Sequence, residues 1–197
     1  MINRYYSVNI RRYIESENED DRQILASAVS SFTCPKNPDI ERFLKDSALE
    51  FTKKQQSVTY LVMSRDIPGL VAGYFALTVK PLEIGVRDIP SNTIRRKIER
   101  VARFDEKTQT YSAAGYLIAQ LGKNYTDGIN NMISGNELLG TALDTIRKIQ
   151  YRIGGMIAFL EAENINSLIN FYCQNGFYLL SNPNSPREEL IQFYRTV

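Results

Sequence analysis

The stretch Gly154–Phe177, which reads GGMIAFLEAENINSLINFYCQNGF, constrains the fold of this chain most strongly. Its apolar run, Met156–Leu160, suits a strand buried on both faces, although so short a run does not exclude a helix. An amphipathic helical pattern follows and is stopped by Asn175–Gly176, a common helix C-terminus signal. A second strand pattern then begins. The order strand, helix, glycine, strand is common, and the spacing from Asn166 to Tyr172 is the feature that narrows it.

Length and composition are those of an ordinary globular protein. The chain has 197 residues, 43% of them apolar and 23% charged, with a net charge of +2. We therefore expect a single domain spanning residues 1–197. No apolar run approaches the roughly 20 residues of a membrane helix, and the N-terminus lacks a signal-peptide core. Cys34 and Cys173 have no metal-ligand spacing and are interpreted as reduced thiols. These features predict a cytoplasmic protein with no membrane partner.

The chain contains no histidine. That absence excludes His-ligated metals, Ser-His-Asp triads and Cys-His dyads. We therefore expect no metal cofactor.

The rest of the chain predicts a mixture of strands and helices. The predicted strands cover residues 5–10, 58–64, 70–79, 114–121, 156–160, 177–180 and 189–195. The predicted helices cover residues 21–30, 40–51, 93–104 and 137–149, besides the one in the opening stretch. Asp39 is the expected cap of the second helix. Gly73 inside a strand indicates a bulge or a close backbone approach. Residues 122–135 and 181–186 are predicted loops.

The helix predicted over 93–104 is strongly basic. Its apolar residues fall on one side, and Arg96, Arg100 and Arg103 fall on the opposite one. This side is either a solvated helix face or an electrostatic seat for a phosphate-rich partner.

Asn166, Tyr172, Gly176 and Phe177 resemble the C-terminal half of the GNAT acetyltransferase superfamily. In that family a strand is followed by an Asn, then by a helix with a Tyr six positions on, and then by Gly-Phe. The ordinary alternative, a half-buried Tyr and a glycine helix stop, stays open. The order of elements is also similar to the whole fold. The resemblance implies an α/β GNAT fold, with a mixed central sheet, splayed parallel strands and flanking helices.

The resemblance also implies acetyl-coenzyme A as the co-substrate. It would lie between two splayed parallel strands, here Ala114–Leu121 and Met156–Leu160. Unpaired amides at the end of the earlier strand would hold the thioester carbonyl and stabilise its oxyanion. By position these amides belong to Leu121, Gly122 and Lys123.

The pyrophosphate would lie at the start of the helix predicted over 137–149, where amide donors and the helix dipole favour an anion. In the family this loop reads Arg/Gln-x-x-Gly-x-Gly/Ala. Here Gly140 fills the last place, but Leu138 stands where the first glycine belongs. Either the loop is shifted or cofactor affinity is weak. Glu137 suits the dipole but would repel a nearby phosphate. The expected cofactor contacts are Ser134, Gly135, Asn136, Leu139, Gly140 and Thr141.

The family's helix tyrosine protonates the leaving thiolate, which makes Tyr172 the expected general acid. Free thiol and phenol pKa values near 8.5 and 10 make that transfer uphill by about 2 kcal/mol. Asn166 would contact the cofactor arm or cap its helix. The central strand carries no carboxylate base. This favours an α-amine acceptor, about a tenth neutral at pH 7, over a lysine. Glu83, Asp105 or Glu161 could still supply a base by folding inward.

The N-terminal half is similar to bacterial GNAT toxins that acetylate aminoacyl-tRNA. The matching phrases are Phe32–Cys34, Phe43–Leu44, Tyr60–Val62 and Gly73–Leu77. Three functions stay open. The first is an N-acetyltransferase that acts on a primary amine, by direct attack in a ternary complex. The second is a toxin that modifies aminoacyl-tRNA, has a small antitoxin partner, and contacts its substrate through Arg96, Arg100 and Arg103. The third is a non-catalytic GNAT-fold binding module. A homodimer also stays open.

Overall fold

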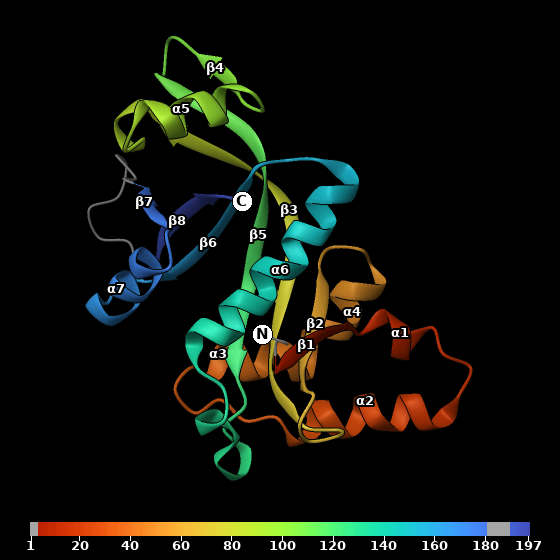
Figure 1. Cartoon of the computed structure of the whole chain (residues 1–197). Helices are drawn as coiled ribbons and strands as arrows, with labels where there is room; N and C mark the ends of the chain where they lie inside the picture. Colours follow the sequence, from red (N-terminus) through yellow and green to blue (C-terminus); the bar gives the residue numbers. More distant parts are fainter. Residues whose placement is uncertain (1–3, 181–189) are drawn as a thin grey trace. The chain divides into compact units, whose positions relative to one another are not determined.

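A computed structural model describes residues 4–180 and 190–197 (Figure 1). The chain forms two compact units, which we describe separately. The first unit comprises Met1–Thr78 and Ala119–Thr145, and the second comprises Val79–Ile118 and Ile146–Val197. The strand order is β1-β2-β3-β5-β6-β8-β7, with β4 paired to β5. The loop predicted over 181–186 and the predicted strand start at Glu189 lie outside the described residues.

Within the described residues, the strands are β1 Tyr5–Asn9, β2 Val58–Ser64, β3 Val71–Gly85, β4 Arg103–Asp105, β5 Thr110–Lys123, β6 Ile157–Glu163, β7 Tyr178–Leu180 and β8 Leu190–Thr196. The α-helices are α1 Arg11–Ile14, α2 Glu19–Ser31, α3 Pro38–Arg42, α4 Ala48–Lys53, α5 Asn92–Glu99, α6 Gly135–Ile153 and α7 Asn166–Gln174. A π-helical turn, η1, covers Phe43–Ser47, and two 3-10 turns cover Val86–Asp88 (η2) and Thr126–Asn131 (η3). Within the described ranges, no helix has both the length and the apolarity needed to cross a bilayer.

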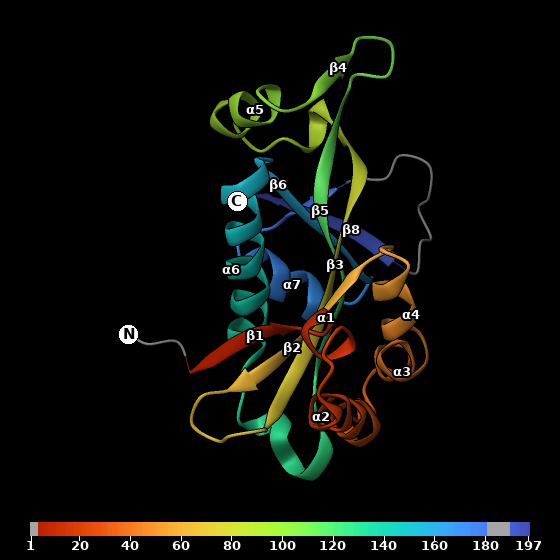
Figure 2. The same cartoon turned by 90° about the vertical axis from the view of Figure 1, so that its right-hand side faces the viewer.

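The first unit is built on the antiparallel strands β1, β2 and β3. The predicted hairpin is confirmed, because β2 pairs with β3 from Val58↔Leu77 to Met63↔Val71. Figure 2 shows α1 to α4 on one side of these strands and the start of α6 on the other. The side under α1 to α4 holds a core in which Phe32 and Tyr74 meet edge to face, 5.2 Å between ring centroids.

The helix predicted over 40–51 is divided into α3, η1 and α4. Asp39 is not its cap, so that prediction is wrong. Asn37 is the cap, because its side chain accepts hydrogen bonds from the backbone of Asp39 and Ile40 at 3.1 and 3.3 Å. Pro38 explains the shift. Proline lacks an N–H and has helical φ, so it favours the first helical position and leaves the cap to the residue before it.

The second unit holds the parallel pair of the sheet. β5 runs parallel to β6 from Tyr116↔Ala158 to Ile118↔Leu160, and β8 lies antiparallel to both β6 and β7. β3 continues to Gly85, so the strand end predicted at Val79 is wrong. Leu82 and Ile84 are buried, whereas Pro81, the residue before Leu82, is exposed. The two-residue alternation continues through the proline, so the strand does not stop at Val79.

The basic helix is shorter than predicted. α5 is capped by Ser91 and ends at Glu99, so the predicted end at Phe104 is wrong. Arg100 is the C-cap residue, and Arg103 begins β4, which pairs with β5. Phe104 packs its ring 4.8 Å from that of Tyr111, a cross-strand contact that favours the hairpin over a further helical turn.

Candidate functional site

The end of β5 lies in the first unit and carries Leu121, Gly122 and Lys123 as strand residues. The parallel pairing with β6 ends at Ile118↔Leu160, although β5 continues to Lys123 and β6 to Glu163.

A buried asparagine fixes the end of β5. Asn124 is 3% exposed, and its Nδ2 donates to the carbonyl of Val71 at 3.0 Å. Its Oδ1 accepts from the backbone of Thr33 and Thr126, and its own N–H donates to Ala72. The backbone N–H, the side-chain Nδ2 and the side-chain Oδ1 of Asn124 are thus all hydrogen-bonded. These bonds hold the strand end against β3 and the Phe32–Cys34 segment.

Gly73 makes room for the other chain segments at this strand end. A Cβ there would lie 2.5 Å from the carbonyl oxygen of Gly122 and 3.2 Å from Cδ1 of Leu138. The register between β2 and β3 also shifts at this point. Both interpretations of Gly73, a bulge and a close backbone approach, are therefore confirmed. Leu138, which stands where the family has a glycine, is 2% exposed and directs its side chain onto Gly73.

The start of α6 is closed by a reciprocal capping box. The backbone of Glu137 donates to Ser134 Oγ at 3.1 Å, and Glu137 Oε2 accepts from the backbone of Ser134 at 2.8 Å. The hydrogen bond from the Ser134 backbone, opposed by partial burial, lowers the pKa of Glu137. The pattern Ser-x-x-Glu is visible in the sequence and could have predicted this cap. One amide donor of this helix end is thus used by the protein's own carboxylate.

Positive side chains surround this helix end. Lys123 Nζ donates to the carbonyl of Ile133 at 2.7 Å. Burial first, and then the charge of Lys36, lower the pKa of Lys123, while Glu137 raises it. Arg4 also acts on Glu137 through its charge. The electrostatics of this region therefore favour an anion more than Glu137 alone suggests.

In the next turn of α6, the backbone of Gly140 is not covered by other side chains. Leu139 and Thr141 are buried, at 0% and 3% exposed, and Thr141 Oγ1 donates back to Glu137 at 2.8 Å. Gly140 differs, because a Cβ there would meet no atom within 4 Å. The backbone at Gly140 is thus open to close approach by a ligand. Gly135 and Asn136 form the first turn of the same helix.

Tyr172 lies in the second unit, on α7. Its ring is 8% exposed and packs against Phe177 and Phe193, at centroid distances of 5.8 and 5.3 Å. Burial raises the pKa of Tyr172 to about 12. No hydrogen bond to its hydroxyl is made by any residue that the structure describes. A buried ring with an uncommitted hydroxyl is what proton donation to a bound group requires.

Asn166 is the first residue of α7 and is exposed. Ile165 is the N-cap, and no side chain caps this helix. The capping role considered for Asn166 is therefore wrong, because Asn166 is already helical. The other end of α7 is held to β8, since Arg195 Nη1 donates to the carbonyl of Asn175 at 2.7 Å.

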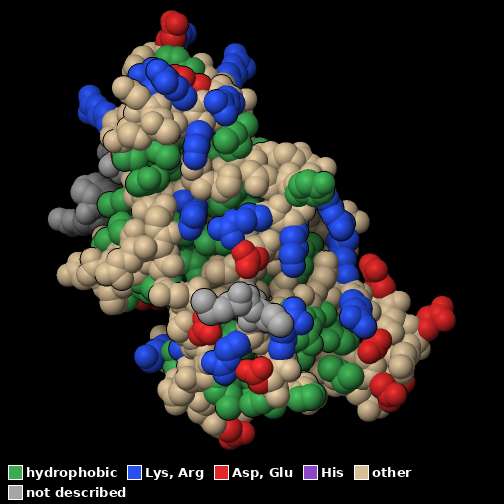
Figure 3. All heavy atoms as spheres, viewed as in Figure 1, with side chains coloured by type: hydrophobic (Ala, Val, Ile, Leu, Met, Phe, Trp, Pro, Cys, Tyr) green, Lys and Arg blue, Asp and Glu red, His purple; other side chains and the backbone are tan. Residues whose placement is uncertain are grey.

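Arg96, Arg100 and Arg103 also lie in the second unit and are exposed. Figure 3 shows Lys and Arg side chains gathered over α5. Arg95 is different, because its Nε donates to Glu99 and to the hydroxyl of Tyr111, both at 3.0 Å. Arg95 thus links α5 to β5, whereas the other three arginines have no ion-pair partner within the described ranges.

Sequence reasoning did not find Gln120 as a candidate. Its Oε1 is buried and has no hydrogen-bond partner in residues 4–180 or 190–197. A buried oxygen without a donor is costly, and a bound N–H would satisfy it. No sequence pattern marks this residue, because its burial depends on tertiary packing.

The comparisons with known proteins agree in fold. Neither a family model nor a curated protein matches the sequence. Many solved structures match this chain, and three of those that cover nearly all of it illustrate the likeness. The toxin AtaT complexed with acetyl-methionyl-tRNAfMet is 16% identical, with 96% of this chain and 94% of that chain covered and a TM-score of 0.64. A Tyr-to-Phe variant of AtaT is 16% identical, covers 98% and 90%, and has a TM-score of 0.65. A Tyr-to-Phe variant of KacT is 17% identical, covers 98% and 95%, and has a TM-score of 0.63.

These likenesses cover both units and agree with the mixed sheet of antiparallel and parallel strands. The chain therefore has the GNAT fold of the AtaT and KacT toxins.

Proposed function

We propose that this chain transfers an acetyl group from acetyl-coenzyme A to the α-amine of an aminoacyl-tRNA, and that it acts as a toxin paired with a small antitoxin. The observation that carries the proposal is Tyr172, a buried phenol with an uncommitted hydroxyl, placed on the helix after β6. The fold adds support, because AtaT was solved with acetyl-methionyl-tRNAfMet and also bound with acetyl-coenzyme A.

In this reaction the amine nitrogen attacks the thioester carbonyl, a C–N bond forms, and the C–S bond then breaks. The amides of Leu121, Gly122 and Lys123 would stabilise the oxyanion. Tyr172 would give its proton to the departing sulfur, and the proton lost by the amine nitrogen would pass through water to restore the phenol. With a phenol pKa of about 12 and a thiol near 8.5, the transfer is uphill by about 5 kcal/mol, more than the free groups would require. Burial raises a thiol pKa as well, which narrows the gap.

The acceptor would enter as a neutral amine, because no carboxylate lies on β5. An α-amine meets this requirement near neutral pH better than a lysine does. Gln120 Oε1 is a suitable partner for one amine N–H, since it is buried and unpaired. It would orient the acceptor without taking its proton.

The residues at the start of α6 fit a pyrophosphate after one rearrangement. Lys123 and Arg4 favour an anion there, and the bare backbone at Gly140 permits close approach. Leu138 is turned toward Gly73, so its bulk does not oppose this fit. Glu137, however, holds the Ser134 amide and must release it to the phosphate.

Arg96, Arg100 and Arg103 would contact the phosphates of the RNA. All three are exposed and have no ion-pair partner among residues 4–180 and 190–197, so they are available to bind phosphates and release counterions. Substituting all three by Ala should weaken tRNA binding uniformly across sequences and flatten its salt dependence. A matched control is Arg87→Ala, a single exposed arginine on η2 outside this group.

The direct test is mass spectrometry of a mixed aminoacyl-tRNA pool after incubation with acetyl-coenzyme A. We expect a mass gain of one acetyl group on the aminoacyl moiety, and its loss with Tyr172→Phe. Acetylation of lysine-containing peptides instead of tRNA would reject the toxin proposal and support an N-acetyltransferase with another acceptor. Failure to bind acetyl-coenzyme A by calorimetry would refute the enzyme and leave a GNAT-fold binding module.

A further inference from the structure

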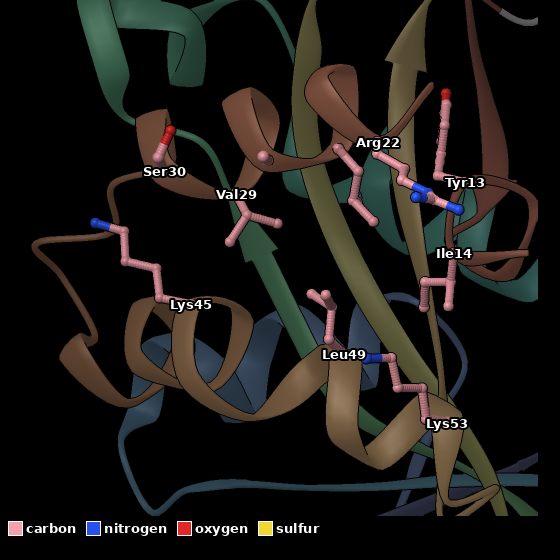
Figure 4. Close-up of a pocket in the computed structure, with 10 residues that line it drawn as sticks. Tyr13, Ile14, Arg22, Val29, Ser30, Lys45, Leu49 and Lys53 are labelled. Atoms are coloured by element: carbon pink, nitrogen blue, oxygen red, sulfur yellow. The ribbon is translucent and has the colours of Figure 1, made fainter. Parts of the chain in front are cut away.

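A groove of about 820 Å³ lies within the first unit. Its walls are α2 on one side and η1 with α4 on the other, and residues of α1 close one end (Figure 4). We call it the helix groove. No step of the proposed reaction uses it.

The walls of the helix groove follow helical spacing. α2 contributes Arg22, Leu25, Ala26, Val29 and Ser30, which form one face of that helix. The opposite wall contributes Lys45, Leu49 and Lys53, spaced four residues apart. Two helix faces placed in this way offer parallel rows of side chains, into which the ridge of a third helix can pack. Lys45 also lies within the π-helical turn η1, a distortion that is frequent at functional sites.

The floor of the helix groove is aliphatic and only partly covered. Ile14, Val29 and Leu49 pack against the core of the first unit, yet each is only half-buried. A helical segment with one apolar ridge would complete their burial. The groove is open along its length, so a small ligand would keep much of its surface in water, unlike one in an enclosed pocket.

The charges on the rim specify the partner further. Arg22, Lys45 and Lys53 are the charged residues of the lining. Each pairs with a carboxylate three or four residues earlier in the chain, at 3.6, 2.7 and 3.7 Å, but none of these acids lines the groove. The pairs of Arg22 and Lys53 are exposed and therefore weak, whereas the Lys45–Glu41 pair is partly buried. The helix groove therefore presents an apolar floor between cationic edges.

We propose that the helix groove binds an amphipathic α-helix of a protein partner, with an apolar ridge flanked by Asp or Glu. The helix-in-groove mode supplies affinity through the ridge, and the flanking charges supply selectivity. This proposal does not depend on acetyl transfer, so tRNA acetylation can fail without affecting it.

The test uses the full ¹⁵N-labelled chain and two designed peptides of about 14 residues, the usual length of a globular helix. Both carry leucines along one helical ridge; one has Glu beside the ridge and its twin has Lys. NMR titration should shift the amide signals of α2 and α4 with the acidic peptide. Its Kd should be about tenfold tighter than that of the basic twin, because three exposed ion pairs combine.

Charge reversal makes the test selective. Replacing Arg22, Lys45 and Lys53 by Glu should invert the preference, so that the basic twin binds more tightly. The matched control replaces Arg96, Arg100 and Arg103 by Glu in the second unit, and it should keep the original preference. Leu49→Asp should abolish the binding of both peptides.

Three outcomes would overturn the proposal. Equal affinities for the two peptides would show that binding is nonspecific apolar contact. Signal shifts confined to other elements would place the site elsewhere. Self-association of the unmodified chain in sedimentation, abolished by Leu49→Asp, would make a second copy of the chain the occupant.

Discussion

Replacing Glu137 by Gln should tighten acetyl-coenzyme A binding while slightly destabilising the protein. Glutamine keeps the reciprocal cap, since it can also accept from the Ser134 backbone. It removes the negative charge that stands where the pyrophosphate is expected. It also removes the favourable interaction between that charge and the helix dipole. The two effects have opposite signs, which distinguishes this explanation from general damage to the fold.

The magnitude follows from the geometry of the cap. Glu137 Oε2 lies 2.8 Å from the Ser134 nitrogen. A phosphate oxygen that takes the same N–H would therefore lie within about 5 Å of the carboxylate. At that distance in water, each pair of like charges costs about 0.8 kcal/mol. Two phosphate charges give about 1.5 kcal/mol, which corresponds to about tenfold in Kd.

The loss of stability should be smaller. A single charge at a helix start contributes about 0.5 kcal/mol, which corresponds to a fall of about 1–2 °C in Tm. Because the folded pKa of Glu137 is lowered, this contribution is present above its unfolded pKa, near 4.3. It is lost as pH falls through the folded pKa. The Tm difference between the two proteins should therefore be seen at pH 7 and vanish in acid.

Isothermal calorimetry measures the affinity, and thermal unfolding measures the stability. S-acetyl-pantetheine, which lacks the diphosphate, serves as the ligand control, and its affinity should not change. Asp144→Asn serves as the protein control, because it removes a charge on the same helix roughly 10 Å further along. An affinity for acetyl-coenzyme A that is unchanged or weaker in a folded Glu137→Gln protein would refute a pyrophosphate site at the start of α6.

Three further predictions concern the same candidate site. Tyr172→Phe should lower kcat by about 10²- to 10⁴-fold with little change in KM or Tm, because the ring packing is kept; unchanged turnover would exclude Tyr172 as the acid. With a Tyr172 pKa of about 12, kcat/KM should rise with acceptor deprotonation near pH 8 and not fall again below about pH 10; a rise centred near pH 10.4 would indicate a lysine acceptor. Gly140→Ala should raise stability by up to about 1 kcal/mol, since its Cβ meets no atom, yet weaken acetyl-coenzyme A binding; denaturant titration and calorimetry measure the two effects, and unaltered affinity would count against ligand approach there.

Much of the fold could be predicted from periodicity. β2 has the predicted bounds, and α6 begins two residues before its predicted start. α7 forms where the opening stretch has its helical pattern. The failures occurred where local signals competed with tertiary packing. The strand was predicted to end at Val79, but burial of Leu82 and Ile84 extends β3 to Gly85. The basic helix pattern ran past Glu99, but pairing of Arg103 with Ser112 ends the helix.

The candidate site was only partly predictable for the same reason. Tyr172 could be found because its spacing from Asn166 is local in sequence. The unpaired oxygen of Gln120 and the use of Ser134 by Glu137 depend on burial and on side-chain orientation. The helix groove could not be predicted either, because its walls are separated in the chain and the π-helical turn has no recognised sequence signal.

The contact between Gly73 and Leu138 joins two positions 65 residues apart in the numbering of this chain. A Cβ at position 73 would lie 3.2 Å from Cδ1 of Leu138, so the two side chains would press against each other. Related chains that restore glycine at 138 should therefore be free of that side-chain constraint at 73, although the carbonyl of Gly122 still restricts it. Position 73 should therefore tolerate substitution less readily than position 138, because its stricter limit is a backbone atom.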